Sequence, residues 1–198
     1  MRHLMIGTLA LCCSLLALPV FAQQAAGAKT AAPAKLPAGA GPAVIVVETV
    51  KGTFEIATFP QEAPKSVEHI LQLINRRFYN GHRVHRVEPG FVVQFGDPNS
   101  RDMSKQALWG TGGSGRSIGV GEFSPKRTHV VGAVAIAHPG DVKLGDSQMY
   151  IVLAPTPRLN GKFTVFGQVI SGMDVVQKLK PNDVIRRVTV RMSEPGAK

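Results

Sequence analysis

Residues 79–98 read YNGHRVHRVEPGFVVQFGDP, and this stretch decides the fold. Two runs rich in β-branched residues flank Glu88-Pro89-Gly90, a composition typical of two strands joined by a tight turn. Side chains alternate between the faces of a strand, so Arg86 is expected beside Val84 on one face of the first strand. The same alternation places Gln94 on one face of the second strand. An arginine and a glutamine are therefore expected to emerge together from one rigid hairpin.

Short apolar runs punctuated by Gly and Pro continue on both sides of this hairpin. A helix is predicted to begin at Pro64, because proline suits a first helical turn and apolar residues then recur at helical spacing. Gly81 is expected to end that helix, and a second helix is expected near 172–180. Many short strands with two helices predict a mostly β domain, an antiparallel barrel or a sandwich. The expected strands are 44–49, 53–59, 83–88, 91–95, 130–137, 148–153, 163–169 and 184–192.

The first 22 residues have the layout of a cleavable secretory signal. A short basic start precedes an apolar run that closes at the small residue Ala22, where cleavage is expected. An uncleaved membrane anchor is the alternative, but Pro19 interrupts a segment only just long enough to span a bilayer. A lipoprotein anchor at Cys12 or Cys13 lacks the small residue that should precede the cysteine. We therefore expect a periplasmic protein that has no stable membrane insertion once the signal has been removed.

The 198-residue chain then divides into a linker and one domain. Residues 23–42 are rich in Ala, Pro and Gly and have almost no side chain to bury, which is typical of a tether. Residues 43–192 are continuously patterned and fit the usual size of a single domain, and residues 193–198 form a short tail.

The positive net charge of the chain suggests binding to an anionic partner as another class of function. Lys and Arg number 23 against 13 acidic residues, giving a formal net charge of +10, a balance that often accompanies nucleic acid or anionic membranes as partners. An exported protein meets no chromosome, so no nucleic-acid partner is expected. The only two cysteines lie within the predicted signal, so disulfides and thiol catalysis are excluded for the mature domain.

Two local motifs suggest chemistry that their context does not support. Residues 110–115 match G-x-G-x-x-G, but they follow Trp109 instead of a strand and lead into another Gly-rich loop, so a nucleotide site is not expected. His82 and His85 are three residues apart, and on a strand this spacing points their rings to opposite faces. No metal site is therefore predicted.

The segment 79–98 resembles the signature of the cyclophilin-type peptidyl-prolyl cis-trans isomerases. The similarity continues in family order through GTGG at 110–113, GAVAIA at 132–137, SQMYI at 147–151 and LNGKFTVFG at 159–167. The resemblance implies an eight-stranded antiparallel barrel capped by two helices, with no cofactor and no metal. The matching positions within the signature are Tyr79, Asn80, Gly81, His85, Arg86, Val87, Pro89, Gly90, Phe91, Gln94, Gly96 and Asp97.

The resemblance also implies a site. Arg86 would donate a hydrogen bond to the prolyl nitrogen, and Gln94 would orient Arg86 and the substrate carbonyl. Phe91 would complete the catalytic group by lining the proline pocket. The implied substrate-binding residues are Val92, Ala137, His138, Gln148, Tyr150, Leu159 and Phe163.

Four positions depart from the pattern of eukaryotic members. Val92 replaces methionine and Phe163 occupies a position often held by histidine or tyrosine, and both keep the pocket apolar. His138 replaces asparagine and is expected to alter which residues are accepted before proline. Arg158 replaces an aromatic residue and is expected to weaken binding of the cyclic peptide cyclosporin.

Two functions follow from the resemblance. The first is a monomeric prolyl isomerase that speeds the folding of exported, proline-containing polypeptides, where X–Pro isomerisation is slow enough to limit folding. The second is a proline-binding or chaperone module in which turnover does not matter. The presence of Arg86 together with Phe91 and Gln94 favours the first, because a binding groove needs no donor beneath the prolyl nitrogen.

Overall fold

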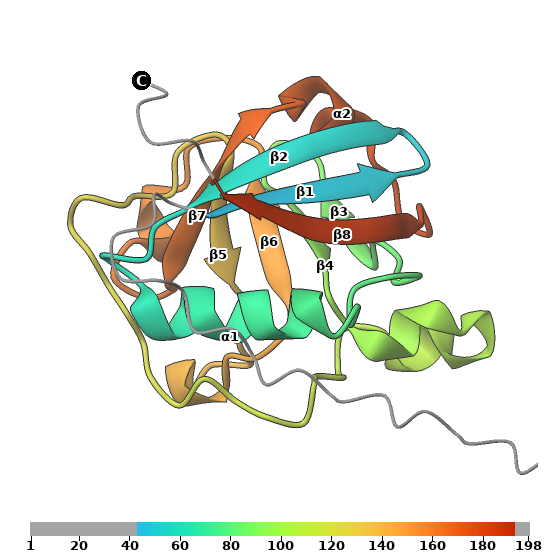
Figure 1. The fold of residues 1–198 in the computed structure, drawn as a ribbon, viewed down its shortest axis with the longest axis horizontal. Coiled ribbons are helices and arrows are strands. Elements are labelled where there is room, and N and C mark those ends of the chain that lie inside the picture. Colours follow the sequence, from blue (N-terminus) through green and yellow to red (C-terminus); the bar gives the residue numbers. More distant parts are fainter. Residues whose placement is uncertain (1–42, 193–198) are drawn as a thin grey trace, which may run out of the picture. The chain divides into compact units, whose positions relative to one another are not determined.

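The structure, a computed structural model, describes residues 43–192, which form one eight-stranded antiparallel sheet curled into a half-barrel (Figure 1). Across the sheet the strands follow the order β3-β4-β6-β5-β7-β2-β1-β8, and an isolated bridge between Arg83 and Val184 joins its two edges. The predicted fold class, mostly β with eight antiparallel strands and two α-helices, is confirmed. The strands are β1 Ala43–Thr49, β2 Gly52–Thr58, β3 Arg86–Glu88, β4 Val92–Phe95, β5 Ala133–Ile136, β6 Met149–Val152, β7 Val165–Ser171 and β8 Ile185–Met192.

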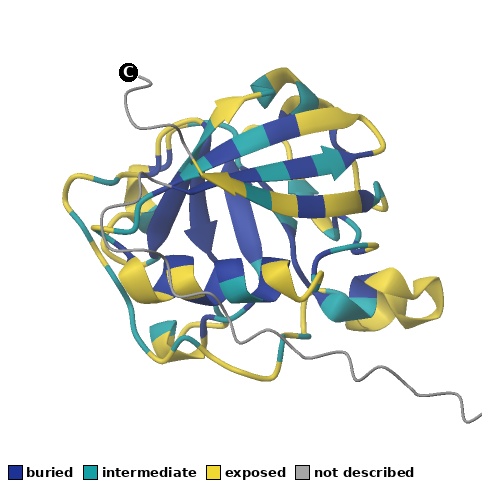
Figure 2. Cartoon of the chain, in the orientation of Figure 1, coloured by how far each residue is buried: buried dark blue, intermediate teal, exposed yellow. Residues whose placement is uncertain are grey.

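Helix α1 (Pro64–Asn75) lies against the sheet with one apolar face turned inward (Figures 1 and 2). Val67 and Ile70 on that face are fully buried, as the helical spacing of apolar residues predicts. The predicted end at Gly81 is wrong, because the helix stops at Asn75. Arg77 there takes a left-handed backbone conformation with φ of 57°, so the chain turns before it reaches Gly81.

Helix α2 (Met173–Lys178) follows β7 and packs next to β2 through the buried side chain of Val176. Gly172 begins it with φ of 76°, and a Cβ atom there would lie 2.5 Å from the carbonyl oxygen of Thr53. Only glycine permits both this backbone conformation and this close approach, so Gly172 fixes the position of α2 against the sheet.

The interior of the half-barrel holds an interior cluster of apolar side chains, to which β4, β5 and β6 contribute alternate residues. As strand alternation predicts, Val93 and Ile151 point into this cluster. The expectation for Val84 is wrong: it is fully buried in the interior cluster instead of lying beside Arg86. Its backbone pairs with Asn182 and Asp183 ahead of β8, so the regular alternation of the hairpin starts only at Arg86.

Residues 98–108 form two short 3-10 helices, Pro98–Arg101 and Met103–Leu108. Asp97 and Asp102 cap them by accepting hydrogen bonds from the backbone N–H of Asn99 and of Ser104. The indole N–H of Trp109 donates to the carbonyl of Asp102, so this side chain anchors the segment.

Neither helix within residues 43–192 has the length and the apolar run needed to cross a bilayer. The predicted signal 1–22, linker 23–42 and tail 193–198 lie outside the described residues.

Candidate functional site

The hairpin of β3 and β4 places Arg86 directly opposite Gln94 in the strand register. The Arg86 Nη1 atom donates to Gln94 Oε1 over 3.3 Å, and Arg86 Nε lies 3.6 Å from Glu88 Oε1. The Arg86 side chain is 44% exposed, so the remaining N–H groups of its guanidinium are accessible to a ligand. The two residues predicted to act together therefore lie in contact.

Gln94 links Arg86 to Gln148 in a chain of hydrogen bonds whose donors and acceptors can be assigned in only one way. Its amide nitrogen donates to Gln148 Oε1 over 2.9 Å, and the Gln148 amide donates to the carbonyls of Gly110 and Gly112 over 2.9 and 2.8 Å. A guanidinium can only donate and a backbone carbonyl can only accept, so both amide orientations are fixed by the two ends. Arg86 is thereby tied to the Gly-rich loop through two side chains.

The Gly-rich loop itself is shaped around a buried carboxylate. Asp97 Oδ2 accepts hydrogen bonds from the backbone N–H of Gly110 and of Gly112, over 2.5 and 3.0 Å. A Cβ atom at Gly112 would lie 2.4 Å from Asp97 Oδ1, so glycine is required there. Gly110 and Gly112 of the G-x-G-x-x-G match therefore pack around a carboxylate, a group that does not suit the binding of an anionic phosphate.

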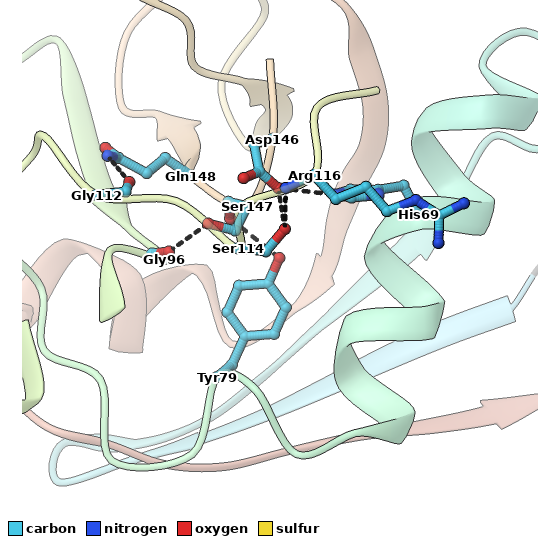
Figure 3. A network of polar contacts seen from close by, with 9 residues as sticks. All are labelled: His69, Tyr79, Gly96, Gly112, Ser114, Arg116, Asp146, Ser147 and Gln148. Atoms are coloured by element: carbon cyan, nitrogen blue, oxygen red, sulfur yellow. Dashed lines mark hydrogen bonds and ion pairs between the residues drawn. The ribbon is translucent and has the colours of Figure 1, made fainter. Parts of the chain in front are cut away.

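A polar network also fixes the segment that leads into Gln148 (Figure 3). Tyr79 Oη donates to the carbonyl of Ser147, and Asp146 accepts hydrogen bonds from His69 Nε2 over 2.9 Å and from Ser114 Oγ over 2.5 Å. Burial acts to raise the pKa of Asp146, but the hydrogen bonds from His69 and Ser114 outweigh it, and the pKa lies below its ordinary value. A charged Asp146 therefore clamps α1 and the Gly-rich loop to the start of β6.

An outer cluster of apolar residues lies on the face of β4, β5 and β6 that is turned away from the interior cluster. Its buried members are Val92, Ala133, Ala135, Tyr150, Val152 and Val165, with the half-buried Phe91, Leu159 and Phe163 packed on them. The cluster surrounds a cavity of about 170 Å³, hereafter the small cavity. The residues lining it are Arg86, Phe91, Val92, Gln94, Ala137, His138, Tyr150, Leu159 and Phe163.

The structure thus brings nine of the ten predicted site residues to one cavity. The tenth, Gln148, lines a neighbouring cavity of about 440 Å³ that also shares Gln94, Ala137 and His138. An apolar cavity and a larger, more polar one therefore lie side by side, with the Gln94–Gln148 contact beside both. What each residue does there stays a prediction.

Phe91 lies between two cations at the rim of the small cavity. The guanidinium carbon of Arg86 is 5.6 Å from the ring centroid, and that of Arg158 is 4.7 Å from it. Both distances are within the range of cation–π attraction. Arg158, which replaces an aromatic residue of the family pattern, therefore orients the phenyl ring instead of adding to the apolar wall.

Aromatic rings form the other side of the small cavity. His138 stacks on Phe163 with centroids 4.3 Å apart, and Phe163 meets Tyr150 edge to face with centroids 5.8 Å apart. His138 Nε2 lies 3.0 Å from the carbonyl oxygen of Lys162, so this side chain is held by the protein. The substitution of asparagine by His138 thus strengthens the wall.

Two residues that support the site were missed by the sequence analysis. His129 lies 2.9 Å from the Tyr150 hydroxyl through Nε2, and Asn160 lies 2.9 Å from His129 through Oδ1. Both residues are distant from Tyr150 in sequence. An isolated histidine and an asparagine in a turn give no signal of this contact.

The two histidines considered for a metal are held by packing. His82 is fully buried, with its ring edge-on to Phe78 and Tyr79. Burial lowers its pKa to about 3, so the ring is neutral at pH 7. His85 lies against Gly110. Within residues 43–192, no three His, Cys, Asp or Glu side chains come close enough to hold an ion.

The lining of the small cavity limits its chemistry. Its lining consists of the Arg86 guanidinium, a primary amide, the His138 imidazole and apolar walls, and it includes no serine, cysteine, lysine or carboxylate. Its only hydroxyl belongs to Tyr150, whose pKa is raised by burial, so this group stays protonated. Both ring nitrogens of His138 are hydrogen-bonded to the backbone, to the carbonyl of Lys162 and the N–H of Gly140, so the histidine is not free to act as a nucleophile. The cavity can hold an apolar ring and offer a hydrogen bond beside it.

Comparison with known proteins identifies a family for this chain. Residues 44–195 match the family described as cyclophilin type peptidyl-prolyl cis-trans isomerase/CLD. The chain is 40% identical over 136 residues to peptidyl-prolyl cis-trans isomerase B of Bacillus subtilis, covering 69% of this chain and 89% of that protein. It is 39% identical over 139 residues to a probable peptidyl-prolyl cis-trans isomerase of Brucella abortus, covering 69% and 70%.

Solved structures agree on the fold. A crystal structure of a cyclophilin type peptidyl-prolyl cis-trans isomerase from Cryptosporidium parvum superposes with a TM-score of 0.67 at 24% identity, covering 77% of this chain and 98% of that one. The family match spans most of the chain, and the B. subtilis relative is matched over nearly its whole length. The chain therefore belongs to the cyclophilin type peptidyl-prolyl cis-trans isomerase family and is an enzyme that acts on proline-containing polypeptides.

Proposed function

We propose that this protein isomerises X–Pro bonds without covalent chemistry, by donating a hydrogen bond from Arg86 to the prolyl nitrogen. Amide resonance makes the rotation slow, with a barrier of roughly 20 kcal/mol. In the twisted amide the nitrogen regains its lone pair and becomes a hydrogen-bond acceptor, whereas in the planar amide it is not. A donor aimed at this nitrogen therefore stabilises the transition state more than the ground state, which is the requirement for catalysis.

The position of Arg86 is the observation that carries this proposal. Its guanidinium lies at the rim of an apolar cavity, is oriented from one side by Gln94 and stays partly exposed. A volume of about 170 Å³ corresponds to roughly five or six water molecules, so the small cavity suits one compact ring and no large ligand. The larger cavity next to it would receive residues that precede the proline, with Gln148 and Ala137 on its wall.

The energies required are consistent with several modest effects acting together. An acceleration of about five powers of ten requires roughly 7 kcal/mol of transition-state stabilisation. One charge-assisted hydrogen bond contributes about 1.5–3 kcal/mol. Fixing the prolyl ring and removing water from the amide supply the remainder. This is why the walls of the small cavity matter as much as Arg86.

The substrates we propose are exported polypeptides, and the site of action is the periplasm. The support for this is the sequence of residues 1–22, with its basic start, apolar run and small exit residue. If the signal is processed as proposed, the mass of the exported chain corresponds to a protein that begins at Gln23. A cell-associated chain with its full N-terminal mass contradicts the export.

The catalytic proposal is tested by two-dimensional exchange spectroscopy on a short X–Pro peptide, which reports binding and interconversion separately. The wild-type chain is expected to exchange the cis and trans signals, and Arg86→Ala to reduce the exchange rate at least tenfold. Arg191→Ala is the matched control, because Arg191 is also a half-exposed arginine paired with a glutamate on a strand, but it lies outside both cavities.

Two results overturn parts of the proposal. If Arg86→Ala weakens peptide binding but leaves the exchange rate of the bound peptide intact, then Arg86 is a binding residue and no donor to the nitrogen. If the wild-type chain binds proline peptides without exchanging their isomers, the site is a binding module.

A further inference from the structure

A chain of hydrogen bonds runs from the wall of the small cavity through a buried histidine to an asparagine at the surface. Tyr150 Oη lies 2.9 Å from His129 Nε2, and His129 Nδ1 lies 2.9 Å from Asn160 Oδ1. Tyr150 and His129 are 5% and 2% exposed, so water does not compete for the bond between them, whereas Asn160 is an exposed residue. Neither His129 nor Asn160 lines the small cavity.

The geometry allows only one arrangement of protons in this chain. Asn160 Oδ1 also accepts the backbone N–H of His129 over 2.9 Å, and because a backbone N–H can only donate, the atom facing it is the oxygen. That oxygen can only accept, so His129 Nδ1 must carry a proton. Burial lowers the pKa of His129, which keeps the ring neutral, so Nε2 has a lone pair and accepts the proton of the Tyr150 hydroxyl.

This arrangement determines where the Tyr150 ring lies. Its backbone is fixed in β6 between β4 and β5, and its hydroxyl is fixed by His129 at the far end of the ring. The ring then meets Phe163 edge to face, and Phe163 stacks on His138. A change in the Tyr150 ring is therefore transmitted to the whole aromatic side of the small cavity.

We propose that His129, held in its Nδ1-protonated form by Asn160, is a positioning residue that fixes the Tyr150 ring as a wall of the small cavity. The inference rests on the proposed function of that cavity in binding the prolyl ring. His129 touches no substrate and acts only through Tyr150. The wall contacts the prolyl ring in both the planar and the twisted amide, so losing its position weakens peptide binding more than it slows the bound reaction.

The first test compares peptide affinity and bound-state exchange rate in single and double variants. His129→Leu leaves the Tyr150 hydroxyl buried without an acceptor and is expected to weaken binding of an Ala-Pro peptide at least fivefold, with less than a twofold change in the exchange rate of bound peptide. Tyr150→Phe removes the hydroxyl and keeps the ring, so a loss of at most about threefold is expected. Adding His129→Leu to Tyr150→Phe is expected to cause no further loss, because both polar partners are then replaced by apolar groups.

His82→Leu is the matched control. His82 is equally buried but lies outside both cavities, and its ring nitrogens have no hydrogen-bond partner among the described residues. The affinity of this variant is expected to equal that of the wild type. If His129→Leu lowers only the unfolding temperature and leaves affinity unchanged, or if the double variant binds as weakly as His129→Leu, the positioning role is refuted.

A second test needs no variant. Nitrogen-15 NMR of the wild-type chain at pH 7 is expected to show His129 with a protonated Nδ1 and an unprotonated Nε2. The opposite tautomer overturns the inference even if His129→Leu fails to fold. If the wild-type chain binds the peptide but does not exchange its isomers, the proposed isomerase mechanism fails, whereas the affinity series and the tautomer still decide the role of His129.

Discussion

Strands β4, β5 and β6 are buried on both faces, yet one face is a core and the other lines the small cavity. On the interior face, Val93 and Ile151 pack against other side chains that are themselves buried. On the outer face, Val92 and Tyr150 are equally inaccessible, but their neighbours, such as Leu159, are half-exposed and leave a cavity. Burial of a residue therefore does not distinguish a core from the wall of a cavity, whereas the packing of its neighbours does.

The two faces also differ in how they treat a buried histidine. His82, at the interior cluster, packs against aromatic rings and has no hydrogen-bond partner among the described residues. His129, behind the outer cluster, has a partner on each ring nitrogen. A partner at each nitrogen fixes the proton positions of His129, whereas no side chain or backbone group among the described residues fixes those of His82.

The largest expected effect is a loss of folding stability, which should be greater for a substitution on the interior face than for one on the outer face. Ile151→Ala removes a fully buried side chain from the interior cluster and is expected to lower the free energy of unfolding by about 2–5 kcal/mol in urea denaturation. Val92→Ala, on the outer face, is expected to cost less, because the space it opens joins the small cavity and can take up water. Val92→Ala should instead weaken peptide binding. Equal stability losses in the two variants would contradict the distinction between the faces.

The sequence predicted the fold well because alternation and turn composition are local properties. Residues 79–98 were sufficient to predict that Arg86 and Gln94 emerge together from one hairpin, and in the structure the two lie directly opposite each other. Strand alternation likewise accounts for Val92 and Val93 lying on opposite faces. The errors occurred where the chain departs from regular pairing. Val84 lies before the ladder of β3 begins, and α1 ends where Arg77 adopts a left-handed conformation that nothing in its residue type predicts.

The supports of the site could not be predicted in the same way. Tyr150 and His129 are 21 positions apart and meet only because β5 and β6 are paired. Likewise, the role of Asp97 in shaping the Gly-rich loop depends on a contact across 15 positions to Gly112. Residue types alone give no indication of such pairs, since a histidine or an aspartate in a loop is usually solvated.

The second prediction uses pH to sharpen the contrast between the histidines. The pKa of His82 is lowered to about 3, first by burial and then by the positive charge of Arg101, whereas an unfolded histidine has a pKa of about 6.5. Between these values the unfolded state binds more protons than the folded state, so the contribution of His82 to the free energy of unfolding becomes less favourable as the pH decreases through this window. We expect His82 to cost about 2 kcal/mol between pH 7 and pH 5.

His82→Leu removes this contribution, so urea denaturation should show a smaller loss of stability between pH 7 and pH 5 than in the wild type. The variant must be compared with the wild type because His129, whose pKa is also lowered by burial, adds to the loss of stability at low pH in both proteins. An unchanged pH dependence in His82→Leu would show that the ring is protonated or solvated in the folded protein.

The smallest expected effect tests how the outer face holds its polar groups. Gln94→Leu interrupts the chain from Arg86 to Gln148 and is expected to slow exchange of the bound peptide about fivefold, corresponding to about 1 kcal/mol for one lost hydrogen bond. Gln94→Glu keeps the acceptor for Arg86 but loses the donor to Gln148, so its loss should be smaller if orientation of Arg86 is what Gln94 provides.

Gln168→Leu is the control for this series, because the Gln168 amide also donates from a strand, to the carbonyl of Val131, but lies outside both cavities. Its exchange rate should match that of the wild type. Were Gln94→Glu to lose as much as Gln94→Leu, the contact with Gln148 would matter more than the contact with Arg86. The rigid part of the outer face would then be the Gly-rich loop, and Arg86 would be oriented by Glu88 and by the ring of Phe91.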